Sequence, residues 1–116
     1  MNDQIILSER DSTGVAIITL NKPDIHNAFN DVLISKLTNC LDDVAADESV
    51  RVVLLQSRGK SFSAGADLKW MKFAANNSSQ ENEEDALKLA DLFHRLDTMP
   101  MPTVARVQGS AFAGGL

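Results

Sequence analysis

Short apolar runs bounded by turn residues recur along the chain. Ile5–Leu7 and Val15–Leu20 predict two β-strands, and Asp11–Gly14 between them has the composition of a tight turn. The two strands are therefore expected to form an antiparallel hairpin. Two later runs, Arg51–Gln56 and Thr103–Val107, are rich in valine, leucine and alanine and predict buried strands.

Between these runs, apolar residues recur at helical spacing. Asn30 is a predicted N-cap, and the helix after it should bury a face made of Val32, Leu33, Leu37, Cys40, Leu41, Val44 and Ala45. A second helix is expected to carry Trp70 and Met71. After a polar loop at 76–80, a third helix should begin among the acidic residues at 81–85 and bury Ala86, Leu89, Ala90, Phe93 and Leu96. Strands separated by helices imply parallel pairing through crossover connections, so the chain is predicted to be an α/β protein.

Length and charge narrow the class of protein. The 116 residues suffice for one small domain with a core. The formal net charge of −5 disfavours nonspecific binding to nucleic acid or to an anionic membrane, since such surfaces need clustered lysine and arginine. Neither a long apolar span nor a basic-then-apolar leader occurs, so a soluble, cytoplasmic protein is expected. One cysteine and two widely separated histidines predict no metal site, and Cys40 is expected to be a buried thiol.

Two turns rich in small residues carry the candidate chemistry. Gly59–Lys69 leads from the strand at 51–56 into the second helix, and Gly109–Leu116 follows the strand at 103–107. A strand-to-helix turn of this kind leaves backbone N–H groups unpaired. Two such turns can aim two donors at one oxygen, which is the arrangement of an oxyanion hole. The alternative for the first turn is an ordinary tight turn in which Asp67 caps the helix.

Four segments, in order along the chain, resemble the crotonase (enoyl-CoA hydratase/isomerase) superfamily. They are Thr19–Pro23 with His26–Phe29, then Val52–Ser57, then Phe62–Leu68, then Ala105–Gly109 with Gly114 and Gly115. The resemblance implies the N-terminal part of a crotonase-like ββα superhelical spiral, with residues 1–116 forming a partial domain that is truncated at its C-terminus. Full-length relatives form homo-oligomers, as trimers or pairs of trimers.

The resemblance also assigns roles to residues of both turns. The N–H groups of Ala66 and Gly114 would form the oxyanion hole and stabilise the enolate of an acyl-CoA thioester. The implied substrate-binding set is Lys22, His26, Ala28, Ala64, Gly65, Asp67, Leu68, Lys69 and Gly115. Within it, Lys69 would lie near the phosphates of coenzyme A, with Lys22 a second candidate. Coenzyme A enters as part of the substrate, and no separate cofactor is implied.

The implied reaction is addition of water across a 2,3-double bond. The segment Ala66–Lys72 with Ala105–Gly109 looks most like bacterial methylglutaconyl-CoA hydratases of leucine breakdown, while plain enoyl-CoA hydratase of fatty-acid metabolism is the broader assignment. The glutamates that activate water in such hydratases would lie beyond Leu116. A different class therefore stays open: a truncated, non-catalytic fragment that acts at most as an acyl-CoA-binding or interaction module. Nucleic-acid binding is disfavoured by the net charge.

Overall fold

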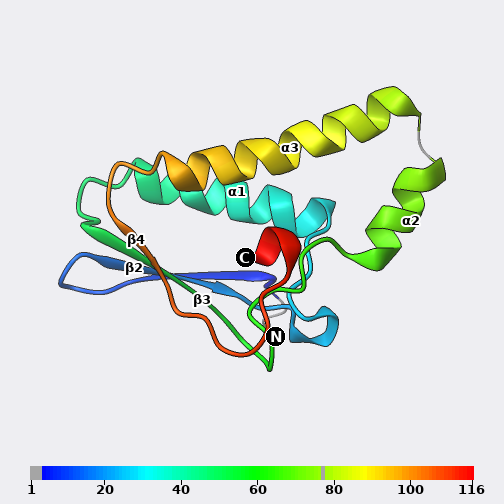
Figure 1. The fold of residues 1–116 in the computed structure, drawn as a ribbon. Helices are drawn as coiled ribbons and strands as arrows, with labels where there is room; N and C mark the ends of the chain where they lie inside the picture. Colours follow the sequence, from blue (N-terminus) through cyan, green and yellow to red (C-terminus); the bar gives the residue numbers. More distant parts are fainter. Residues whose placement is uncertain (1–3, 77) are drawn as a thin grey trace.

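A four-stranded sheet covered on one face by two helices organises the chain in a computed structural model (Figure 1). The structure describes residues 4–76 and 78–116, without the side chains of Leu68, Phe73 and Ala74. The elements are β1 (Ile6–Arg10), β2 (Val15–Leu20), η1 (Pro23–Ile25), α1 (Asp31–Ala45), β3 (Val52–Ser57), α2 (Leu68–Asn76), α3 (Ser79–Asp97), β4 (Thr103–Ala105) and η2 (Ala113–Gly115).

The strands lie in the sheet in the order in which they occur along the chain, β1-β2-β3-β4. The predicted hairpin is confirmed, because β1 pairs with β2 in antiparallel register. Its turn is held by Asp11, whose carboxylate accepts from the hydroxyl of Thr13 and from the N–H groups of Val15 and Thr13, and these hydrogen bonds lower the pKa of Asp11. β2 with β3 and β3 with β4 are parallel, as the crossover pattern predicts.

Helix α1 begins as predicted but buries a slightly different face. The side chain of Asn30 accepts a hydrogen bond from the N–H of Leu33 at 2.9 Å, which caps the helix. The buried face consists of Leu33, Ile34, Leu37, Leu41 and Val44. Val32, predicted to be buried, is 43% exposed, Ala45 is exposed too, and Cys40, predicted to be a buried thiol, is only half-buried. Val32 and Ala45 lie about 100° around the helix from a buried neighbour, so they flank the stripe that contacts the sheet.

Helix α3 starts earlier than predicted and buries fewer residues. Ser78 caps it, its Oγ accepting from the N–H of Glu81, so the predicted polar loop is shorter than 76–80, and Asn77 lies outside the described residues. Leu92 is the buried residue of this helix, with Leu89 and Leu96 partly buried. The predicted burial of Ala86, Ala90 and Phe93 is wrong, since all three are exposed; the first half of α3, which holds Ala86, extends beyond the sheet and α1 (Figure 1).

Strand β4 is shorter and more exposed than the sequence predicts. It covers Thr103–Ala105, and all three residues are exposed. β4 is the last strand of the sheet, so one of its edges carries no neighbouring strand within the described residues. One further backbone hydrogen bond, from the N–H of Arg106 to the carbonyl of Leu55, follows before the chain turns toward η2.

Candidate active site

Three loops meet where β2, β3 and β4 end. These strands are parallel, so their carboxyl ends lie at one edge of the sheet. Isolated parallel bridges then join Phe29 to Ala66 and Ser63 to Ala111. The loops after β2, β3 and β4 are thereby linked, and the two predicted turns are neighbours in space.

The Ala66 N–H belongs to a peptide unit whose orientation is fixed by Phe29. The N–H of Phe29 donates to the carbonyl of Gly65 at 2.6 Å, and the N–H of Asp67 donates to the carbonyl of Phe29 at 2.7 Å. In a trans peptide the C=O and the following N–H point in opposite directions. The N–H of Ala66 therefore points away from Phe29, and no described group accepts from it.

The Gly114 N–H is a second free donor. The short helix η2 closes with hydrogen bonds from Gly115 to Phe112 and from Leu116 to Ala113, and these leave the N–H of Gly114 without an acceptor among the described residues. A methyl group placed on Gly65, which has a φ of +82°, would lie 2.9 Å from the carbonyl oxygen of Phe112 and 3.6 Å from the nitrogen of Gly114. The two turns therefore pack in direct contact.

Two buried polar side chains, those of Asn27 and Ser63, join the loops through hydrogen bonds. The sequence analysis assigned neither residue to the site. The Asn27 side chain accepts from the N–H of Lys22 and donates to the carbonyls of Arg58 and Ser61. The Oγ of Ser63 accepts from the N–H of Gly65. Asn27 has a φ of +54°, and asparagine tolerates this left-handed region better than most residues. An asparagine shortly after the strand and Pro23 was therefore the sequence feature that could have indicated its structural role.

An apolar cavity of about 460 Å³ opens beside the second donor. It lies between the sheet and the helices α1 and α3, and its wall includes Leu20, Phe29, Leu37, Leu41, Leu55, Phe62, Leu92, Phe93, Leu96, Ala105, Gly114 and Gly115. An N–H group at an apolar wall is poorly screened by water, so its attraction for a developing negative charge is stronger than in solvent.

Some predicted ligand-contact residues serve the local structure. Asp67 caps α2, its carboxylate accepting from the N–H of Lys69 at 2.8 Å, so the predicted cap is confirmed, and its contact with substrate stays a prediction. A methyl group on Gly115 would lie 2.5 Å from the carbonyl oxygen of Ser63, so glycine is required there for close packing. Ala28 is buried, and Ala64 donates its N–H to the neighbouring loop.

The predicted basic and imidazole contacts lie at the surface. The Nζ of Lys22 pairs with Asp24 at 3.3 Å, and Lys69 is exposed at the start of α2. His26 is exposed, with its Nδ1 3.2 Å from the Oγ of Ser61. Leu68 begins α2, and its side chain lies outside the described residues. These residues surround the turns, and their contacts with coenzyme A stay predictions.

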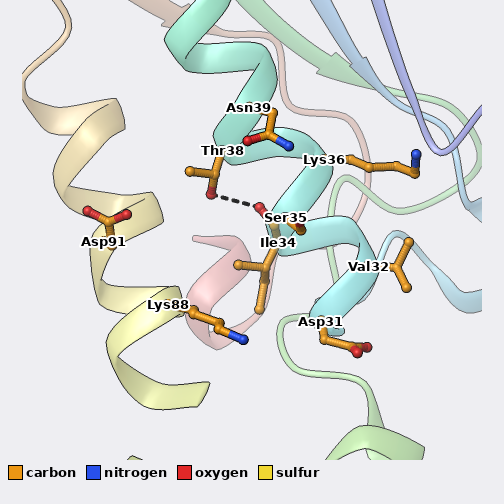
Figure 2. Close-up of a pocket in the computed structure, with 9 residues that line it drawn as sticks. All are labelled: Asp31, Val32, Ile34, Ser35, Lys36, Thr38, Asn39, Lys88 and Asp91. Atoms are coloured by element: carbon orange, nitrogen blue, oxygen red, sulfur yellow. Dashed lines mark hydrogen bonds between the residues drawn. The ribbon is translucent and has the colours of Figure 1, made fainter. Parts of the chain in front are cut away.

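A larger hollow of about 590 Å³ lies elsewhere, between α1 and α3 (Figure 2). It is lined by Asp31, Val32, Ile34, Ser35, Lys36, Thr38, Asn39, Lys88 and Asp91. Figure 2 shows the hydroxyl of Thr38 engaged with the carbonyl of Ile34 in its own helix. None of the predicted site residues lines this hollow. In the described part of the chain, no group of His, Cys, Asp and Glu could hold a metal ion, and no helix is long and apolar enough to cross a membrane.

Comparison with known proteins gives consistent matches. The family model of enoyl-CoA hydratase/isomerase matches residues 10–116. A Thermus thermophilus protein provisionally named enoyl-CoA hydratase is 46% identical over 101 residues, which are 87% of this chain and 40% of that protein. The solved enoyl-CoA hydratase of Shewanella pealeana has a TM-score of 0.92 at 40% identity, covering 97% of this chain and 42% of its own. That of Mycobacterium smegmatis has a TM-score of 0.91 at 37% identity, covering 97% and 43%. The chain thus spans about two fifths of the length of these relatives.

Proposed function

The chain belongs to the enoyl-CoA hydratase/isomerase family, and we propose that it supplies the oxyanion hole and acyl-CoA site of an enzyme that hydrates an enoyl-CoA thioester. Its fold is the N-terminal part of the crotonase fold. The observation that carries the proposal is the pair of free N–H donors, Ala66 and Gly114, on two turns in contact beside an apolar cavity. The proposed hole is formed by these two N–H groups.

The proposed chemistry needs such donors because hydration passes through an enolate. As a base takes one proton from water, the water oxygen bonds to C3 of the enoyl group, and the electron pair of the double bond moves toward the thioester carbonyl, whose oxygen becomes anionic. C2 of this enolate then takes a proton from an acid, the electron pair returns from the oxygen, and the net change is addition of one water molecule. Two fixed N–H groups stabilise the anionic oxygen, and each is worth about 2.7–4 kcal/mol in the transition state. Because the carbonyl of the substrate is neutral, much of this stabilisation appears only as charge develops.

The remaining parts of the site are proposed from the family. Lys69 and Lys22 would attract the phosphates of coenzyme A, and Lys22 would have to leave Asp24 to do so. Coenzyme A belongs to the substrate, and no further cofactor is invoked. Methylglutaconyl-CoA, an intermediate of leucine breakdown, is the proposed specific substrate. The groups that activate water belong to the part of the complete enzyme beyond these residues, and that enzyme would act in the cytoplasm as a trimer or pair of trimers.

A backbone-donor substitution in the complete protein tests the proposal. Ala66→Pro removes one donor of the hole, and a loss of about 10²- to 10³-fold in kcat on crotonyl-CoA is expected. Ala66→Gly keeps the N–H and is the matched control, with kcat close to that of the parent. Circular dichroism and thermal unfolding establish that both variants are folded. A folded Ala66→Pro variant with unchanged kcat would remove Ala66 from the mechanism.

The second candidate function is a non-catalytic acyl-CoA-binding or interaction module. It is favoured by the length of the chain, which spans about two fifths of the relatives that it matches. A folded sample of the 116-residue chain separates the two functions. Hydration of crotonyl-CoA by this chain would exclude the module, whereas binding of crotonyl-CoA without turnover would support it.

A further inference from the structure

We infer that Phe29 is a positioning residue that sets the spacing between the two proposed donors: its backbone fixes the Ala66 amide and its ring supports Gly114. The inference rests on the proposed function, since it concerns the same oxyanion hole. It adds a residue to which neither the family match nor the sequence motifs assign a role at this site.

The backbone of Phe29 holds the first donor through two hydrogen bonds. Its N–H donates to Gly65 and its carbonyl accepts from Asp67, on either side of Ala66. The peptide unit of Ala66 therefore cannot rotate without breaking the 2.6 Å bond to Gly65. This bridge fixes the direction of the donor without using any side chain of the turn.

The ring of the same residue lies against the second donor. A methyl group placed on Gly114 would lie 3.3 Å from Cε2 of Phe29 and 3.2 Å from Cζ of Phe93. The two rings meet edge to face, with centroids 5.9 Å apart and planes at 73°. Gly114 is not among the glycines with positive φ, so the two rings, rather than the backbone conformation, oppose a larger residue here, and a methyl group would push a ring aside by a few tenths of an ångström.

The two rings differ in how far they can yield. Phe29 is 5% exposed and is held in the core by α1, β2 and the cavity wall, whereas Phe93 is 38% exposed and can turn toward solvent. Pressure from a side chain at position 114 would therefore be resisted mainly by Phe29. The Phe29 ring thus supports the η2 turn at Gly114, beside the direct contact of the two turns at Gly65 and Phe112. A displacement of about 1 Å at a catalytic group can cost about 10²-fold in rate, and the smaller shift expected at Gly114 should cost less.

A pair of compensating substitutions in the complete protein tests this role. Gly114→Ala keeps the N–H but pushes the turn away from the ring, and a fall of up to about tenfold in kcat on crotonyl-CoA is expected with little change in KM. Phe29→Leu removes the ring edge and should lower kcat by about tenfold. In the double variant the added methyl group occupies the space that the ring leaves, so kcat should be no lower than in Phe29→Leu alone. Phe29→Met, which keeps most of the volume, is made in parallel in case Phe29→Leu does not fold.

Leu33→Val is the matched control, since Leu33 is buried in the same core on α1 and does not line the cavity. It should lower thermal stability as Phe29→Leu does and leave kcat unchanged. If the losses of Gly114→Ala and Phe29→Leu multiply in the double variant, or if Leu33→Val lowers kcat equally, Phe29 has no positioning role. Ala66→Pro distinguishes this failure from that of the proposed function. If Ala66→Pro has unchanged kcat, the proposed oxyanion hole is itself rejected. If Ala66→Pro has lowered kcat, the hole stands and only the role of Phe29 is rejected.

Discussion

Ser63 donates its hydroxyl hydrogen to the backbone carbonyl of Asn27 at 3.0 Å, although 36 residues separate them in the chain. Both residues are completely buried. The same hydroxyl oxygen accepts from the N–H of Gly65, one residue before the first proposed donor. The loop after β2 and the turn after β3 are therefore joined by polar groups that have no access to water, and loss of one group leaves its partners unsatisfied.

Asn27→Ala should be among the more damaging single substitutions in this segment. It removes the partner of the N–H of Lys22 and of the carbonyls of Arg58 and Ser61, and it places alanine at a φ of +54°. A loss of about 3 kcal/mol in the free energy of unfolding is expected. Urea denaturation followed by circular dichroism measures it. Asn39→Ala, at an exposed position of α1, is the control and should change stability by less than about 0.5 kcal/mol.

Asn27→Asp removes the side-chain N–H donors of Asn27 while keeping the size of the side chain, so it tests the donors alone. The carboxylate keeps an acceptor for the N–H of Lys22 but faces the carbonyl oxygens of Arg58 and Ser61. Burial beside these oxygens would raise the pKa of the introduced acid, so the folded state would bind its proton more tightly than the unfolded state. The deficit in stability should therefore shrink as the pH falls below that raised pKa. An equal deficit at pH 7 and at pH 4.5 would contradict the assigned hydrogen bonds.

Gly65→Ala should impair the site as well as the fold. The introduced methyl group would lie 2.9 Å from the carbonyl oxygen of Phe112, and the alanine would have to adopt a φ of +82°. Destabilisation of about 2–3 kcal/mol is expected, together with a fall in kcat of the complete protein, because the clash separates the two turns. Gly14→Ala is the matched control: its φ is +96°, and its closest contact is the flexible side chain of Arg51. That variant should lose about 1 kcal/mol without loss of kcat. Equal effects on kcat would show that turn contact is unimportant.

Cys40 should react slowly in the folded protein. Burial raises the pKa of its thiol above the ordinary value, with opposing effects from Ser8 and Arg10. The folded state therefore holds the proton more tightly than the unfolded state, and the stability contributed by the neutral thiol is lost as pH rises from about 8.5 through the raised pKa. Alkylation by iodoacetamide at pH 8 should be roughly tenfold slower than in urea. Cys40→Ala should abolish the labelling and flatten this part of the stability profile, and equal rates in both states would contradict the burial.

Local sequence information was sufficient for the elements whose determinants lie close together in the chain. Asn30 and the periodic leucines of α1 define a cap and a buried stripe within a few turns, and Asp11 defines the hairpin turn. β4 could not be judged in this way, because its valine pattern is that of a buried strand while its exposure depends on which neighbours cover it.

In the candidate site, too, features with local determinants could be predicted and features that depend on distant segments could not. The small residues at 64–66 and 114–115 indicate that the backbone of each turn lies close to a neighbouring group, and the two turns are in contact. That Phe29 reaches both turns, or that Ser63 bonds to the loop after β2, follows from packing between segments distant in sequence. An apolar residue such as Phe29 looks like any other core position when only its neighbours in the chain are considered.

The succession β1-β2-β3-β4 has a consequence for the nascent chain. Each strand is placed beside the one synthesised immediately before it, so an emerging strand finds a docking edge already available and need not wait for later segments. Translation at about 5–20 residues per second leaves several seconds between β2 and β4, far longer than hairpin closure requires. The sheet can thus assemble vectorially during translation, and the Gly114 turn would be the last of the described pieces to reach its place.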